Sequence, residues 1–212
     1  MRNRIANLSV CPPIEGSFER ALCGSAGLAS KGDSPAGKEA AAPAGPADPT
    51  GFTHAAGANL FGYYTSAADL KVGDWQMNNF HIGDEDAFKA WESGDRMPTY
   101  GPVMLEFDNM TSPMQTNELG ADFHSESERI LPTAYAIGAD GKIDFVGTSA
   151  KLGKVTFHGK LDLPKLKEIT DAQASPNGPP EGFDGQATVL TGTLTVGDKT
   201  FENVALSWFG GD

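Results

Sequence analysis

Apolar and polar residues alternate along several stretches of this chain, which is the pattern of β-strands with one buried face. In residues 99–107, Val103, Leu105 and Phe107 alternate with Met104 and Glu106, and in residues 154–161 the apolar Val155, Phe157 and Leu161 fall on one face. In the second stretch, Thr156, His158 and Lys160 fall together on the polar face. Because successive side chains of a strand point to opposite sides, each stretch predicts a strand that covers a hydrophobic core on one side.

Two short turn signals connect such stretches. The dipeptides Asp140-Gly141 and Gly197-Asp198 each lie between two apolar runs. A glycine beside an aspartate between two apolar runs is typical of a β-hairpin. Hairpins in succession predict a largely antiparallel sheet with one face buried.

Two further stretches have the features of short helices. Asp84 begins an acidic turn, and Phe88 and Trp91 follow it three residues apart, on one helix face. Asp162 is a predicted helix cap, and Pro164 falls in the first turn, where proline is tolerated. We therefore expect two helices among the strands.

The remaining pattern completes the predicted fold. Residues 108–129 are polar and without a clear period, so we expect a long loop there. Gly159 and Gly192 each lie inside an expected strand and indicate a bulge or a tight bend. The sequence predicts a mainly β fold: a curved antiparallel sheet or barrel-like domain with two short helices over residues 58–212.

Composition changes sharply near Gly57. Residues 24–57 contain ten Ala, seven Gly, four Pro and three Ser, whereas all Trp, all Tyr and ten of the twelve Phe follow. A segment with so few large apolar side chains cannot offset the entropy of ordering its backbone. We expect residues 1–57 to be a disordered Ala/Gly/Pro-rich tail and tether. It holds Cys11 and Cys23, whose pairing the sequence leaves open.

Charge narrows the classes of partner. The net charge is −12, and residues 58–212 carry 23 acidic and 11 basic side chains. Such a surface repels phosphate backbones and anionic lipids, so we expect neither nucleic-acid binding nor membrane insertion. Solubility is the favoured explanation of this charge, ahead of a specific electrostatic role. No signal peptide is visible and no apolar run is long enough to span a membrane, so we expect a soluble protein of open compartment.

Aromatic residues crowd the first third of the expected domain and are its candidate ligand-binding residues. We select Tyr63, Tyr64, Trp75 and Tyr100. Such side chains line apolar pockets and partner-binding patches. They also fill hydrophobic cores, so burial in the core is the competing interpretation.

Histidines beside carboxylates are the candidate metal ligands. We select His81, His124, His158 and Glu126, because imidazole and carboxylate groups suit zinc, iron and manganese. Their spacing matches no known metal-binding motif. Any cofactor is therefore expected to be a divalent metal at most.

No catalytic motif supports an enzyme: there is no Gly-x-Ser-x-Gly, and both cysteines precede the expected domain. We expect a non-enzymatic module that binds a small apolar molecule or a protein partner. Two alternatives stay open, a metal-dependent enzyme or metal-binding protein, and a structural or assembly protein.

Overall fold

The computed structural model describes residues 46–55, 57 and 59–211. All of these residues belong to one compact unit. Residues 1–45 of the segment predicted to be disordered, residues 1–57, lie outside the described residues, and so do both cysteines.

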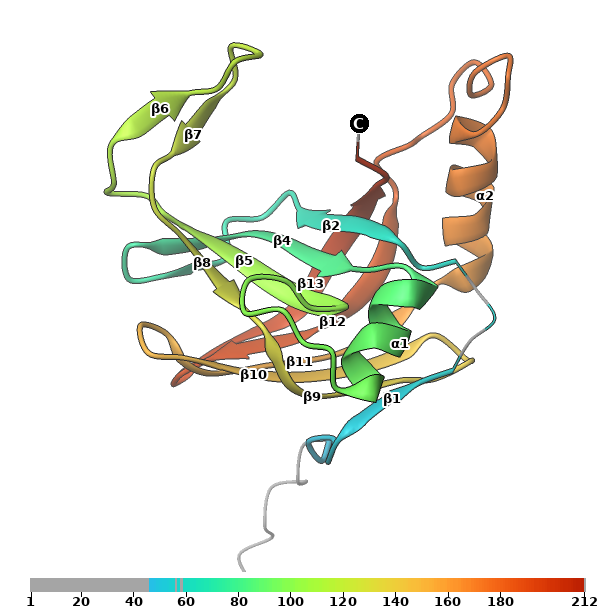
Figure 1. The fold of residues 1–212 in the computed structure, drawn as a ribbon. Coiled ribbons are helices and arrows are strands. Elements are labelled where there is room, and N and C mark those ends of the chain that lie inside the picture. The colour runs from blue at the N-terminus through green and yellow to red at the C-terminus, as the bar shows by residue number, and fades with distance from the viewer. Residues whose placement is uncertain (1–45, 56, 58, 212) are drawn as a thin grey trace, which may run out of the picture. The chain divides into compact units, whose positions relative to one another are not determined.

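Strands dominate the described part of the chain, and two helices interrupt them (Figure 1). The helices are α1 (Glu85–Ser93) and α2 (Leu163–Gln173). The strands are β1 (Phe52–His54), β2 (Gly62–Ser66), β3 (Lys71–Val72), β4 (Trp75–Ile82), β5 (Val103–Asn109), β6 (Met114–Thr116), β7 (Asp122–His124), β8 (Ser127–Ile130), β9 (Pro132–Ile137), β10 (Lys142–Ser149), β11 (Gly153–Leu161), β12 (Thr188–Val196) and β13 (Lys199–Phe209). The mainly β fold with two helices is confirmed.

One large sheet contains all strands except β6 and β7, which pair with each other. Its order is β1-β9-β10-β11-β12-β13-β2-β4-β5-β8, with β3 paired to β4. Neighbouring strands are antiparallel apart from β1, which runs parallel to β9. The two predicted hairpins are confirmed as β9–β10 and β12–β13. The sheet also includes β1, so the prediction of disorder up to residue 57 is wrong for Phe52–His54, which pair with β9.

The sheet curls into a half-barrel whose two ends approach each other (Figure 1). β8 runs into β9 through a single residue, Leu131. Beside this junction the Ser149 hydroxyl of β10 donates a hydrogen bond to Glu128 of β8 at 2.7 Å. Two features of the strands favour the curl. Gly159 and Gly192 are partners in register across β11 and β12, and the pairing of β12 with β13 shifts at Gly192. The predicted bulge at Gly192 is confirmed.

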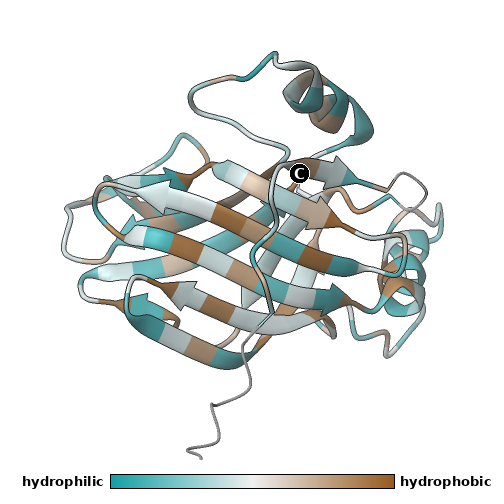
Figure 2. Cartoon of the chain, turned by 90° about the horizontal axis from the view of Figure 1, so that it is seen from below, coloured by the Kyte–Doolittle hydropathy of each residue, from teal (hydrophilic) through white to brown (hydrophobic). Residues whose placement is uncertain are grey.

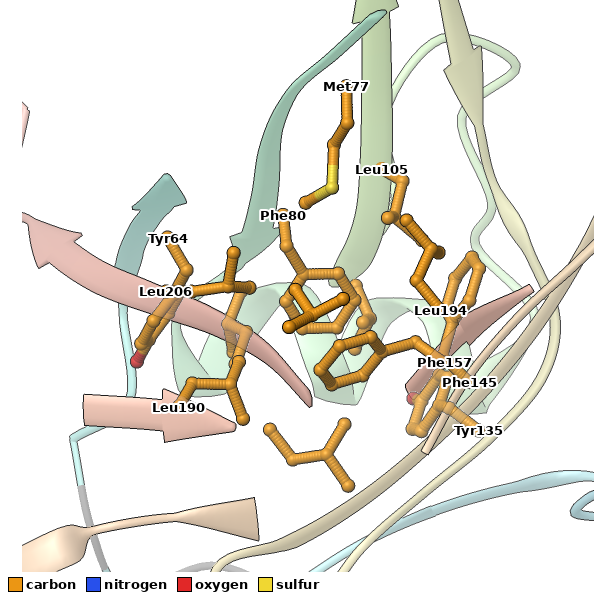
Figure 3. Close-up of a cluster of buried hydrophobic side chains, with 14 of the residues drawn as sticks. Tyr64, Met77, Phe80, Leu105, Tyr135, Phe145, Phe157, Leu190, Leu194 and Leu206 are labelled. Carbon is orange, nitrogen blue, oxygen red and sulfur yellow. The ribbon is translucent and has the colours of Figure 1, made fainter. Parts of the chain in front are cut away.

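The interior of the half-barrel is filled by its own side chains (Figure 3). Phe80, Phe145 and Phe157 have no exposed surface. The ring of Phe80 lies 6.0 Å from that of Phe145 and 5.0 Å from that of Phe157, centre to centre. Seen from below in Figure 2, hydrophobic and polar positions alternate along the outer strands, as a sheet with one buried face requires.

Both predicted helix starts are confirmed. The Asp84 side chain accepts a hydrogen bond from the backbone N–H of Ala87, and the Asp162 side chain accepts one from Lys165. Both bonds satisfy backbone donors that a helix start otherwise leaves free. The loop expected over residues 108–129 is wrong in part, because this segment contains β6, β7 and β8. Side chains of β6 are exposed on both sides, so no apolar alternation marks that strand.

Candidate functional site

His81 lies near the end of β4 and faces away from the interior of the half-barrel. Its neighbours Phe80 and Ile82 point inward and are fully buried, so the alternation of the strand directs His81 outward. An outward imidazole is ordinarily in contact with water, yet His81 is only 1 % exposed. Other side chains must therefore cover it on the outside of the sheet.

Three aromatic rings surround His81. The ring centre of Tyr63 lies 4.8 Å from that of the imidazole, that of Tyr100 lies at 5.4 Å, and that of Phe61 lies at 6.0 Å in an edge-on arrangement. The Tyr100 hydroxyl and His81 Nε2 share a hydrogen bond of 3.0 Å. Phe209 is the cross-strand partner of Tyr63. We call Phe61, Tyr63, Tyr100 and Phe209, with His81 at their centre, the aromatic patch.

The Trp208 side chain holds the backbone of the patch in place at Phe61. The indole N–H of Trp208 donates a hydrogen bond to the Phe61 carbonyl at 2.9 Å. The next residue, Gly62, has a φ of 146°, and a Cβ there would lie 2.1 Å from the same indole nitrogen. Only glycine leaves room for this close approach of β2 and β13. The position of Phe61 on the outer face thus depends on Gly62.

The outer surface of the patch is apolar and open. Phe61 is 37 % exposed and Phe209 is 44 % exposed, while Tyr63 and Tyr100 are half-buried. Large aromatic side chains that stay exposed together are unusual away from interaction sites. The arrangement offers flat rings for contact, with polar groups beneath them.

Burial and two nearby carboxylates act on the pKa of His81 in opposite directions, and burial has the larger effect. Burial lowers the pKa of His81, whereas the charges of Glu106 and Asp84 raise it and offset part of this effect. Burial also raises the pKa of Tyr100, and the nearby Asp84 adds to the shift. Arg129 of β8 lies opposite Glu106 of β5 and is paired with that carboxylate at 3.2 Å. Two acidic residues, Asp84 and Glu106, therefore lie near the buried side of the aromatic patch.

Two buried polar atoms on this side of β4 have no hydrogen-bond partner among the described residues. They are Nδ1 of His81 and Oδ1 of Asn79. The Asn79 amide donates to Glu106 at 3.4 Å, which leaves its carbonyl oxygen unused. Buried polar groups are paired in most native proteins, so unpaired atoms here mark a local cost in stability.

The four predicted ligand-binding residues do not share one site. Tyr63 and Tyr100 meet at His81, as just described. Tyr64 points the other way, into the core, where its hydroxyl donates to the Leu60 carbonyl at 2.7 Å and burial raises its pKa. Trp75 begins β4 and so lies at the opposite end of that strand from His81. Its ring faces the Lys151 ammonium, 4.7 Å from the ring centre.

The predicted metal ligands lie on separate elements. His81 is on β4, His158 on β11, and His124 on β7, where its Nδ1 lies 3.2 Å from the Ser112 carbonyl oxygen. Glu126 bonds Lys151 at 2.6 Å and Asn109 at 2.8 Å, and these bonds lower its pKa. Within residues 46–55, 57 and 59–211, no three His, Cys, Asp or Glu side chains are placed to hold one metal ion.

Sequence reasoning did not select Phe209 as a site residue, although a signal for it exists. Val204, Leu206 and Trp208 alternate along β13 and point inward, so Phe209 falls on the opposite, outer face. An aromatic residue at an outward position of a strand is a candidate contact residue. Its neighbour across the strands, Tyr63, is set by the register of β13 and β2, which no local pattern encodes.

Neither helix in the described part of the chain is long and apolar enough to cross a membrane. No protein-family model, curated protein or solved structure matches this chain significantly.

Proposed function

We propose that this protein is a non-enzymatic binding module that recognises a protein partner through the aromatic patch. The observation that carries the proposal is the exposure of Phe61 and Phe209 beside Tyr63 and Tyr100 on one outer face. Aromatic residues dominate the binding energy of protein interfaces because they bury much apolar area with few lost rotamers.

A protein partner fits better than a small apolar molecule held inside the half-barrel. The interior already contains Phe80, Phe145 and Phe157 in ring-to-ring contact. A guest there would have to displace close-packed side chains, which costs about 1–3 kcal/mol or more. The outer patch needs no such rearrangement.

The charge around the patch indicates the chemistry of the partner. Asp84 and Glu106 both act on His81, and the whole chain carries a net charge of −12. A complementary segment presents an apolar side chain flanked by Lys or Arg, because cations are attracted by the net negative charge and stack on exposed rings.

A random peptide library displayed on phage tests this proposal. We expect the full chain to select peptides with an aromatic or aliphatic residue flanked by Lys or Arg. Affinity for the selected peptides is then measured in the double variant Phe61→Ser/Phe209→Ser. Loss of two central aromatic contacts is expected to weaken binding by at least about tenfold.

The matched control is Phe123→Ser, which removes a phenylalanine of similar exposure, 45 %, on β7. The control is expected to bind the peptides as the unmodified protein does. Selection of no peptide, or equal binding by the double variant, contradicts the proposal. Dependence on Phe123 instead of the patch contradicts it as well.

A further inference from the structure

β1 (Phe52–His54) is an edge strand whose contacts are with elements far along the chain. It lies at one end of the large sheet, parallel to β9 (Figure 1). The backbone N–H of Tyr135 donates a hydrogen bond to the Gly51 carbonyl at 2.9 Å, and that of Ala55 donates one to the Ile137 carbonyl at 2.9 Å. β2, the next strand in the chain, pairs instead with β13 and β4. β1 is thus held by β9 and not by the strand that follows it.

The Phe52 side chain of β1 packs against α1 and β9. Its ring centre lies 5.2 Å from that of Tyr135 on β9 and 6.2 Å from that of Trp91 on α1. The Arg96 guanidinium, just after α1, lies 4.4 Å from the centre of the same ring. Contacts of an aromatic ring with other rings and with a cation stabilise a docked side chain beyond the apolar area that it buries.

Two more contacts fix the segment on either side of Phe52. The imidazole of His54 stacks on the Phe88 ring of α1, with centres 3.8 Å apart and planes 5° apart. The Asp48 carboxylate pairs with the Lys154 ammonium of β11. We call the surface that receives the two rings of β1 the β1 slot, and its residues are Phe88, Trp91, Arg96 and Tyr135.

Only a short connection joins β1 to the body of the domain. Leu60 is 6 % exposed and belongs to the hydrophobic core, so residues 55–59 alone separate it from the end of β1. Four of these five residues are Ala or Gly, so the connection has little apolar side chain to bury. An element on a short hinge is the kind of element that two copies of a chain exchange.

The β1 slot does not distinguish between its own strand and the strand of a second copy. Each contact of the segment joins it to α1, Arg96, β9 or β11, and the same contacts form when the segment comes from another molecule. We propose that two copies of this chain exchange residues 46–54 and form a dimer in which each slot holds Phe52 and His54 of the other copy. The exchange is reciprocal, so the dimer is symmetric and closed.

Chain concentration and salt decide how often the exchange occurs. A short linker holds its segment near the slot at an effective concentration in the millimolar range. A second copy therefore competes with the chain's own strand at about 1 mM and not at about 1 μM. The net charge of −12 opposes the approach of two copies, and salt screens this repulsion. We expect the dimer at high chain concentration and high ionic strength.

A cross-link between β1 and β9 tests the exchange, because Thr53 and Ala136 are register partners. The full chain carries Thr53→Cys and Ala136→Cys, with Cys11→Ser and Cys23→Ser so that no other thiol reacts. Unlabelled and ¹⁵N-labelled chains are mixed in urea, refolded together at high ionic strength, oxidised and digested. Mass spectrometry then shows whether the link between positions 53 and 136 joins a light half to a heavy half, which only an exchanged strand does.

Mixed links are expected after refolding at about 1 mM, and their share is expected to fall at least about tenfold at about 1 μM, where the chain's own strand fills the slot. Links that join only halves of the same isotope at about 1 mM overturn the proposal. Absence of any link between positions 53 and 136 overturns it as well, because the strand then does not occupy the slot.

The matched control is the same chain locked before it is concentrated. Oxidation at about 1 μM closes the link within one molecule, where exchange is negligible. The locked chain is expected to stay monomeric through the same refolding at about 1 mM, and the reduced chain is expected to form dimers. Size-exclusion chromatography with light scattering measures both. Equal dimer formation by locked and reduced chains overturns the proposal.

Phe123→Ser separates the exchange from association through exposed apolar side chains. It removes a phenylalanine of β7 that is 45 % exposed and makes no contact in the β1 slot. This variant is expected to form the dimer as the unmodified protein does. Loss of the dimer in Phe123→Ser shows association through β7 instead and overturns the proposal.

Discussion

At the scale of single residues, His81 combines features that ordinarily exclude each other. It is directed outward by its strand, yet it is almost fully buried, and one of its ring nitrogens has no partner among the described residues. Burial favours the uncharged ring more strongly than the charges of Glu106 and Asp84 favour the charged one, which explains the lowered pKa. The aromatic patch thus depends on keeping a titratable group uncharged.

This makes part of the folding stability dependent on pH. The folded protein holds the pKa of His81 below its usual value of 6.5. The unfolded chain therefore takes up this proton first as the pH falls, and proton uptake favours the unfolded state. The His81 contribution is fully present above pH 6.5 and is lost as the pH falls through the lowered pKa.

The variant His81→Gln removes the titration and keeps a polar group for Tyr100. Urea unfolding at pH 7.5 and pH 5.5 measures the effect. We expect a smaller loss of unfolding free energy on acidification in the variant than in the unmodified protein. Carboxylates elsewhere contribute equally to both proteins. An identical loss in the two proteins excludes His81 as a source of the pH dependence.

At the scale of elements, β6 and β7 form an arm, residues 110–125, that projects away from the large sheet (Figure 1). Of the seven large apolar residues exposed in the described part of the chain, four lie on the arm: Met110, Met114, Leu119 and Phe123. None of them belongs to the hydrophobic core cluster. Hydrogen bonds within the arm, such as that from the Thr116 hydroxyl to Asp122, hold it together.

We expect the arm to contribute little to folding. The backbone N–H of Ser125 donates to the Pro113 carbonyl at 2.9 Å, so these two residues can be joined by a two-residue turn. Replacing residues 114–124 with Asn-Gly is expected to change the unfolding free energy by less than about 0.5 kcal/mol. Urea unfolding measures this change. A loss of about 2 kcal/mol or more would show instead that the arm supports the sheet.

Sequence patterns predicted the elements whose two faces differ and missed those whose faces do not. β11 and the β12–β13 hairpin alternate clearly, because one side packs on the core and the other meets solvent. β6 is exposed on both sides, so its residues carry no such pattern. Both helices were predictable because their caps are local.

The sequence predicted some residues of the candidate site but not that they lie together. Tyr63 and Tyr100 were selected as aromatic residues, but their meeting at His81 depends on the pairing of β2 with β4 and on the path from α1 to β5. Long-range pairing of this kind has no local signal.

At the scale of the whole molecule, the half-barrel depends on a close approach of strands around one large side chain. A Cβ at Gly192 would lie 2.5 Å from the His158 carbonyl oxygen and 2.7 Å from the Phe157 ring. A Cβ at Gly159 would lie 2.5 Å from the same ring. The missing side chains of two glycines therefore make room for Phe157 at the centre of the core.

Gly192→Ala is expected to lower the unfolding free energy by about 1–3 kcal/mol, the usual cost of overpacking a core. Gly185→Ala is the matched control, because its nearest heavy atom would be 3.8 Å from the new Cβ. The control is expected to change stability by less than about 0.5 kcal/mol. Urea unfolding compares the two, and equal effects would contradict this account of the curl.

The fit between Phe157 and the two glycines also constrains how this protein can evolve. A side chain at position 192 would also meet the His158 carbonyl oxygen at 2.5 Å, and one at position 159 would meet the Thr191 carbonyl oxygen at 2.7 Å, so a smaller residue at position 157 would not free either position. A smaller residue at 157 alone leaves a void in the core, which is itself destabilising. Each single step is therefore disfavoured, and positions 159 and 192 are expected to remain glycine in descendants of this sequence.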